Sequence, residues 1–99
     1  METLQQVLAT LHEHMSEFQD LGVRRLGVFG SVAEGEATPG SDIDILVEFD
    51  PGRKSFDNYM DLKFRIEELF SGRKVDLVLE HVLKPAIRPY VERTVRYVA

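Results

Sequence analysis

Cysteine and tryptophan are both absent from this 99-residue chain. Without cysteine it has no disulfide framework, no cysteine nucleophile and no thiolate metal site. It also lacks a basic surplus, because twelve Lys and Arg stand against seventeen Asp and Glu, for a formal net charge of -5. Proteins that bind long nucleic acids non-specifically release counterions with an excess of basic side chains, so we expect no such binding here.

Composition and the first residues indicate the broad class of protein. An apolar share of 43% with 29% charged residues is typical of a globular domain and not of a membrane protein. The length predicts a single domain over residues 1–99. The opening METLQQ has no basic stretch followed by an apolar stretch, unlike a signal peptide. We therefore expect a cytoplasmic protein.

The spacing of apolar residues divides the chain into alternating helices and strands. Apolar side chains at steps of three and four are typical of a helix with one buried face, whereas alternation or a short apolar run is typical of a strand. The predicted helices cover residues 3–20, 55–70 and 89–98, and the predicted strands cover residues 23–29, 42–49 and 75–80. Glycines in residues 31–40 predict a loop with room for one helical turn.

Four aromatic residues belong to the predicted helix 55–70. Phe56, Tyr59, Phe64 and Phe70 follow its apolar spacing, so we expect them to lie mostly in the core. Stacking of one of these rings on a nucleotide base is the alternative.

Three acidic residues that are distant in the sequence come together in the predicted sheet. The strand, helix and strand over residues 42–80 form a βαβ unit, whose two strands run parallel. Asp42 and Asp44 lie at the start of one strand, and Asp76 lies near the start of the other. Parallel strands start at the same edge of a sheet, so we expect the three carboxylates to gather there on one face.

The end of strand 23–29 is predicted to lie at the same edge. It finishes at Gly30 and Ser31, and the short return to Asp42 lets this strand run antiparallel beside strand 42–49. A glycine at that point lets a phosphate approach the backbone N–H groups closely. The expected architecture is an α/β (α+β) fold with a small mixed three-stranded sheet flanked by helices.

Carboxylates gathered in one place repel one another unless a cation neutralises them. Oxygen ligands without cysteine favour a hard divalent cation, Mg²⁺ or Mn²⁺, over Zn²⁺. The sequence therefore predicts a metal-bound phosphate chain at this corner. Taken singly, each acid has an ordinary alternative role: Asp42 as a loop-end cap, Asp44 as a solvated strand residue and Asp76 as an edge charge.

The stretch GSVAEGEATPGSDIDILVEF resembles the signature of the DNA polymerase beta-like nucleotidyltransferase superfamily. In that signature Gly-Ser is followed, ten residues after the serine, by Asp-x-Asp on the next strand. The chain is most similar to the minimal nucleotidyltransferase (MNT) family of prokaryotes, whose members are about this short and have a third Asp on the following strand. The resemblance covers residues 23–79 well and implies the polymerase beta-like nucleotidyltransferase fold.

The resemblance also implies roles for individual residues. Gly30 and Ser31 match residues that hold the β and γ phosphates of a nucleoside triphosphate, and Ser41 belongs to the same nucleotide-binding block. The catalytic and metal-binding residues of the family match three acids here, Asp42, Asp44 and Asp76. The first two match ligands of two Mg²⁺ ions. The third binds the catalytic metal in the family and helps to deprotonate the attacking hydroxyl.

The function implied by the resemblance is transfer of a nucleoside monophosphate, AMP from ATP, to a hydroxyl with release of pyrophosphate. The chain has no residues left for an acceptor-binding domain, so we expect a partner to supply the acceptor. In the MNT family that partner is a small helical HEPN protein, a toxin that the nucleotidyltransferase neutralises as its antitoxin, in several cases by adenylylating a tyrosine. Hetero-oligomers and homo-oligomers are both compatible with this role.

One residue departs from the family pattern. Many members carry Arg or Lys at the position of Glu34, where a cation would face the phosphates. A carboxylate there repels them unless it points to solvent or pairs with Arg24, Arg25 or a basic residue of the last helix. The alternative function is therefore a catalytically weak or inactive antitoxin that neutralises its partner by occlusion. A stand-alone enzyme for small molecules is a further alternative, although nothing predicted here encloses a small acceptor.

Overall fold

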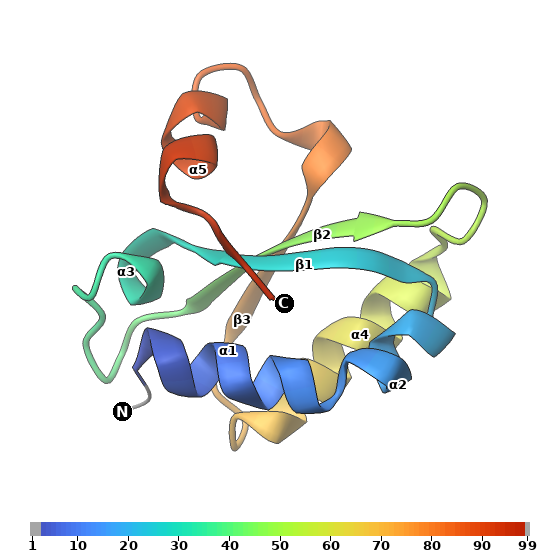
Figure 1. Cartoon of the computed structure of the whole chain (residues 1–99), viewed down its shortest axis with the longest axis horizontal. Coiled ribbons are helices and arrows are strands. Elements are labelled where there is room, and N and C mark those ends of the chain that lie inside the picture. Colours follow the sequence, from blue (N-terminus) through green and yellow to red (C-terminus); the bar gives the residue numbers. More distant parts are fainter. Residues whose placement is uncertain (1–2, 99) are drawn as a thin grey trace.

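The computed structural model describes residues 3–98 as helices around one sheet (Figure 1). The elements, in chain order, are α1 (Leu4–Glu13), α2 (Met15–Asp20), β1 (Val23–Phe29), α3 (Gly30–Ala33), β2 (Ile43–Phe49), α4 (Phe56–Leu69), β3 (Val75–Leu79), the 3₁₀ turn η1 (Glu80–Val82), α5 (Arg88–Thr94) and β4 (Arg96–Tyr97).

The sheet has the order β3-β2-β1-β4. β2 and β3 run parallel, and β1 runs antiparallel to both β2 and β4. The mixed sheet and the βαβ unit are therefore confirmed, but the expectation of three strands was wrong by one. Tyr97 and Arg96 pair with Gly27 and Val28, where the apolar spacing predicted helix. A Cβ at Gly27 would overlap the side chain of Val95, so this glycine makes room for the returning chain.

One face of the sheet is covered by α1, α2 and α4, which lie below it in Figure 1. The main core forms there, with Leu11, Phe18, Ile45 and Ile66 fully buried. The predicted helix 3–20 is in fact two helices that meet at His14. Because α2 continues the apolar stripe after this break, the spacing alone did not reveal it.

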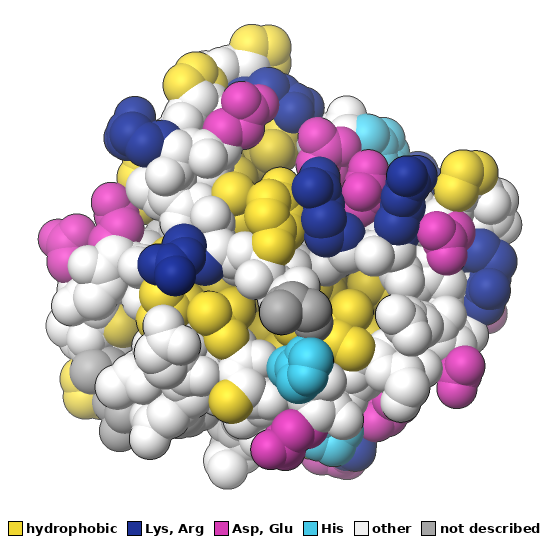
Figure 2. All heavy atoms as spheres, viewed as in Figure 1, with side chains coloured by type: hydrophobic (Ala, Val, Ile, Leu, Met, Phe, Trp, Pro, Cys, Tyr) yellow, Lys and Arg dark blue, Asp and Glu magenta, His cyan; other side chains and the backbone are white. Residues whose placement is uncertain are grey.

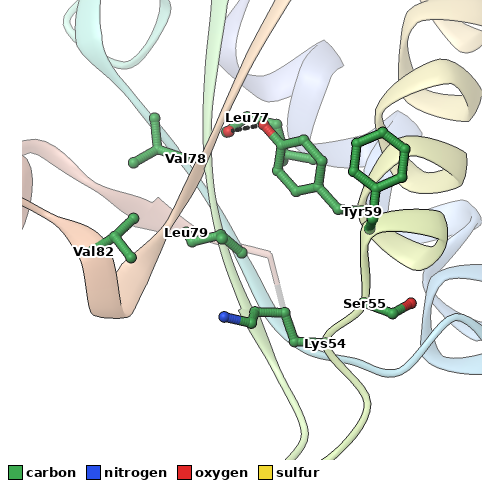
Figure 3. Close-up of a pocket in the computed structure, with 8 residues that line it drawn as sticks. Lys54, Ser55, Tyr59, Leu77, Val78, Leu79 and Val82 are labelled. Atoms are coloured by element: carbon green, nitrogen blue, oxygen red, sulfur yellow. Dashed lines mark hydrogen bonds between the residues drawn. The ribbon is translucent and has the colours of Figure 1, made fainter.

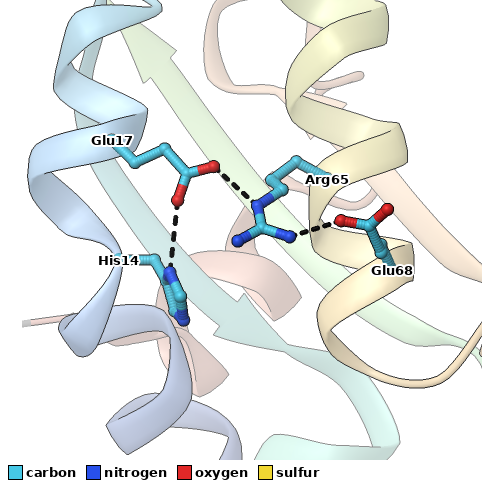
Figure 4. A network of polar contacts seen from close by, with 4 residues as sticks. All are labelled: His14, Glu17, Arg65 and Glu68. Atoms are coloured by element: carbon cyan, nitrogen blue, oxygen red, sulfur yellow. Dashed lines mark hydrogen bonds and ion pairs between the residues drawn. The ribbon is translucent and has the colours of Figure 1, made fainter.

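A polar network on the surface joins α2 to α4 (Figure 4). The Arg65 Nε donates to Glu17 Oε1 at 2.6 Å, and a second nitrogen of the same guanidinium bonds to Glu68. His14 Nδ1 lies 3.2 Å from the other oxygen of Glu17. The Arg65 hydrogen bond is the main reason that the pKa of Glu17 lies below its ordinary value. The network therefore fixes α2 against α4.

The other face of the sheet carries α5 and η1, which rise above it in Figure 1. A smaller core joins Phe29 and Leu46 of the sheet to Leu83 and Val91. The start of β2 lies next to α3 at the end of β1 (Figure 1), and β3 starts beside β2 in the sheet. This corner is the one in which the sequence places the acidic residues.

The free edge of β3 is partly occupied by side chains of α4. The Tyr59 hydroxyl donates to the carbonyl of Leu77 at 2.6 Å, and Glu67 Oε2 accepts from the N–H of Val75 at 3.2 Å. These contacts satisfy β3 backbone groups that point away from β2.

Two of the aromatic residues assigned to the core are not buried. Phe56 is 78% exposed and Phe64 is 58% exposed, whereas Phe70 is buried as expected and Tyr59 is half-buried. Phe56 is the first residue of α4, so no preceding helical turn covers it. For this ring and for Phe64 the predicted core position was wrong.

Charges of both signs lie next to one another on the surface. On the face that Figure 2 shows, dark blue and magenta side chains are adjacent at the upper right and at the top. Ion pairs of the described residues include Arg88 with Glu80 at 3.2 Å and Arg25 with Glu48 at 3.6 Å. Among residues 3–98 no helix is both long and apolar enough to cross a membrane.

Candidate functional site

Asp44 and Asp76 are direct neighbours on adjacent parallel strands. Their Cα atoms are register partners in the β2–β3 pair, and on the other side Asp44 is opposite Phe29 of β1. Register partners in a sheet point to the same face. The alternation of buried and open positions in β2 places Ile43 and Ile45 in the main core, so both aspartates face the α5 side. The predicted register is confirmed.

Gly30 fits tightly against the carboxylate of Asp44. Its φ of +72° lies in the left-handed region, which glycine adopts without the steric cost of a side chain. A Cβ at this position would overlap the carboxylate of Asp44. The backbone at the β1–α3 junction therefore lies directly beside the acidic group, as close approach of a ligand to the backbone requires.

Ser31 follows Gly30 in the short helix α3 and is half-buried. Its carbonyl accepts from the N–H of Glu36 at 2.9 Å, which closes the turn after the helix. Within residues 3–98 its hydroxyl has no hydrogen-bond partner. The hydroxyl of the predicted phosphate-binding serine is therefore available at the carboxylate corner.

The loop before β2 is held by hydrogen bonds of Ser41. Its hydroxyl accepts from the N–H of Thr38 at 2.9 Å, and its carbonyl accepts from Arg73 Nε at 3.1 Å and Nη2 at 3.0 Å. Lys74 Nζ lies 3.9 Å from Asp42 Oδ2. The predicted nucleotide-binding Ser41 thus shapes the loop that presents Asp42. The two basic residues were missed, although they directly precede the strand of Asp76 in the sequence.

The carboxylates of Asp42, Asp44 and Asp76 interact electrostatically. The pKa of Asp44 is raised from 3.8 to about 6, first by burial and then by the charges of Asp76 and Asp42. The three predicted site residues therefore lie within electrostatic reach. In the described part of the chain, no group of three acidic or histidine side chains is already positioned to bind a metal ion. Asp42, Asp44 and Asp76 offer oxygen ligands, and a bound divalent cation would relieve the repulsion among their carboxylates. The chemistry of these three residues therefore fits Mg²⁺ or Mn²⁺.

Glu34 makes a contact that the sequence did not indicate. Tyr90 of α5 donates its hydroxyl hydrogen to Glu34 Oε2 at 2.7 Å. This hydrogen bond is the main cause of the raised pKa of Tyr90, and burial adds to it. Arg25, one of the expected partners, instead pairs with Glu48. Glu34 therefore joins α3 to the last helix through a phenol, a contact that leaves no signal in apolar spacing.

A family comparison agrees with this arrangement of residues. Residues 9–97 match the nucleotidyltransferase domain family. The chain is a member of that family. The matched segment contains the Gly30-Ser31 turn and all three predicted acids.

Individual relatives support the assignment of this chain to the nucleotidyltransferase family. The protein adenylyltransferase MntA of Thermococcus cleftensis is 41% identical over 99 residues, which cover 99% of this chain and 98% of the relative. A solved structure assigned by name to the minimal nucleotidyltransferases superposes with a TM-score of 0.80 at 37% identity, covering 96% of this chain and 95% of the other. The fold prediction is therefore confirmed.

A more distant structure shares the fold. It contains a tri-AMPylated HEPN toxin from Shewanella oneidensis in complex with an MNT antitoxin. The matching chain superposes on this nucleotidyltransferase with a TM-score of 0.64 at 16% identity, over 93% of this chain and 71% of its own length. The likeness at this identity shows a common architecture.

Proposed function

We propose that this nucleotidyltransferase transfers AMP from ATP to a hydroxyl of a HEPN protein and acts as its antitoxin in the cytoplasm. The observation that carries the proposal is the pairing of Asp44 with Asp76 on one sheet face, directly beside Gly30. The name of the MntA relative and the AMPylated HEPN toxin of the distant structure support the choice of AMP and of acceptor. The net charge of -5 disfavours a long nucleic acid as the acceptor.

The proposed nucleotide site uses the β1–α3 junction. The backbone at Gly30 and the Ser31 hydroxyl, which has no partner among residues 3–98, would hold the β and γ phosphates of ATP, because a glycine there allows close approach. Ser41, through its hydrogen bonds to Thr38 and Arg73, keeps the neighbouring loop in place. These residues fix the triphosphate at the edge of the sheet where the acids lie.

Asp42, Asp44 and Asp76 would hold two Mg²⁺ ions, for which Mn²⁺ is a chemical substitute. When bound, the ions neutralise the triphosphate and lower the charge barrier to in-line displacement. Asp76 is exposed at the free edge strand, so a partner's hydroxyl can reach it. We assign to Asp76 the acceptance of the proton from that hydroxyl.

The proposed reaction is a single group transfer. The acceptor oxygen forms a bond to the α-phosphorus of ATP, and the bond from that phosphorus to the oxygen that bridges to the β-phosphate breaks. Pyrophosphate leaves, and the acceptor proton passes to Asp76 and then to water. The product is an AMP ester of the acceptor hydroxyl.

The second candidate is a non-catalytic antitoxin that acts by occlusion. The observation in its favour is Glu34, an exposed carboxylate at the end of the helix that carries Ser31. The Tyr90 hydroxyl donates a hydrogen bond to this carboxylate, which offsets part of its negative charge toward a bound phosphate. We therefore retain the catalytic proposal as the first.

Incubation with a purified HEPN protein encoded beside the gene of this chain tests the proposal. We expect label from the α-phosphate of ATP to appear on that protein with Mg²⁺ or Mn²⁺ and not with EDTA. Asp44→Asn and Asp76→Asn should remove the transfer, whereas Asp61→Asn, an exposed acid of α4, should leave it unchanged. Neutralisation of the toxin without any labelling would support occlusion instead.

A further inference from the structure

An apolar groove of about 440 Å³ follows the free edge of β3, between the start of α4 and η1. Figure 3 shows Tyr59 of α4 facing Leu77 and Leu79 of β3, with Val82 on the other side of the strand and Lys54 at one end. The groove lies outside the corner described above, because none of the three acids lines it.

Two residues of the groove expose large apolar surfaces. Phe56 is 78% exposed and Val82 is 56% exposed, and both line the groove. Neighbouring apolar side chains that remain this open on a folded protein are typical of an interaction site. An aromatic ring of this kind contributes much of the binding free energy when a partner covers it.

The groove borders the proposed site. Val78 lines it and lies two residues after Asp76 in β3, so the two side chains share a face and their Cα atoms are about 7 Å apart. Burial, and after it the charge of Asp76, raises the pKa of Tyr59 on the opposite wall. A chain that fills the groove therefore comes directly to the acid to which we assign the acceptor proton.

The contacts of the β3 edge restrict what can enter. Because Tyr59 and Glu67 already bond to the backbone of β3, an added strand would have to displace them. Side chains of a helix or loop fit without this loss. A second copy of the chain would bring two net charges of -5 together, which opposes self-association. The geometry favours a different protein that inserts apolar side chains.

We propose that the groove binds an apolar segment of the acceptor protein, and that this segment adjoins the hydroxyl that is adenylylated. The segment inserts its side chains between Phe56 and Val82, and its docking delivers the hydroxyl to Asp76. Lys54 lines the groove, and its Nζ lies 3.2 Å from His81 Nε2; this cation suits an acidic residue in the same segment. The inference rests on the proposed function for the identity of the acceptor.

Serine substitutions at the exposed positions test the groove. Phe56→Ser and Val82→Ser should each weaken calorimetric binding of the purified HEPN protein about tenfold or more. They should raise the KM for that protein while the KM for ATP and the kcat at saturation stay unchanged. Phe64→Ser is the matched control, because this phenylalanine of the same helix is 58% exposed and does not line the groove.

The outcomes separate the groove from the proposed function. If the parent chain binds the HEPN protein without labelling it, and Phe56→Ser still weakens that binding, the groove stands and the catalytic proposal fails. If Phe56→Ser binds like the parent, or if Phe64→Ser weakens binding equally, the groove proposal is overturned. Self-association of the parent that Phe56→Ser removes would also overturn it, because the occupant would then be a second copy.

Discussion

Replacing Asp44 with asparagine should stabilise the metal-free protein, because it removes the charge of a half-buried carboxylate. The pKa of this carboxyl is about 6 in the folded protein, against an ordinary value of 3.8. Above pH 6 the group is ionised in both the folded and the unfolded state, and folding includes the full cost of its burial and repulsion. Below pH 3.8 it is protonated in both states, so the cost disappears.

The size of the effect follows from this shift. One pKa unit corresponds to about 1.4 kcal/mol, so a rise of roughly two units sets an upper limit of about 3 kcal/mol. Asp44 lies at an open corner of the sheet, and water screens part of its charge. We therefore expect Asp44→Asn to raise the free energy of unfolding by about 1–2 kcal/mol at pH 7.5, and most of this gain to vanish at pH 4.

Urea unfolding in EDTA, followed by circular dichroism, measures the free energy of unfolding at pH 7.5 and at pH 4. Asp61→Asn, at an exposed acid of α4, is the control. Added Mg²⁺ should stabilise the parent more than Asp44→Asn, since the variant has lost a proposed metal ligand. A variant less stable than the parent at pH 7.5 would show that Asp44 is a paired structural group. An equal gain at both pH values would show that the charge is not the cause.

Gly30→Ala should lower the free energy of unfolding by at least about 2 kcal/mol, because the new Cβ overlaps the carboxylate of Asp44. Gly35 has the same sign of φ but open space around it, so Gly35→Ala should lower the free energy of unfolding by only about 1 kcal/mol. Urea midpoints of the two variants test this, and equal losses would contradict the overlap. Glu34→Gln keeps an acceptor for the α5 phenol and removes a charge, so calorimetry should show ATP affinity rising roughly threefold, with the gain shrinking as salt increases. Unchanged affinity at low salt would place this side chain away from the phosphates. Arg65→Gln should lower the urea midpoint at pH 7, and the deficit should close as the pH falls through the lowered pKa of Glu17, because the protonated carboxyl no longer pairs. A deficit that is constant with pH would mean that packing, not the ion pair, is lost.

The pairing of the two site strands could be predicted because it depends on simple periodicity. Ile43 and Ile45 alternate with Asp44, and a helix of suitable length separates this strand from that of Asp76. A parallel βαβ unit with one buried face then allows few registers. The structure has the predicted one.

Other features depend on contacts that no local pattern records. β4 is two residues long, too short for alternation to show, and it forms because Gly27 lets the chain pack against β1. The hydrogen bond between Glu34 and Tyr90 joins residues 56 positions apart. Phe56 has the spacing of a core residue, but it begins its helix at the end of the sheet. Burial at such a position depends on what lies around it in space.

The side chains of Tyr59 and Glu67 on the β3 backbone have a consequence for the behaviour of the chain in concentrated solution. An edge strand with unpaired N–H and C=O groups is a template on which further strands add, which leads to cross-β fibres. Here the two α4 side chains interrupt the row of free groups along β3. They act as gatekeepers against fibre growth while leaving the neighbouring apolar side chains open to a folded partner.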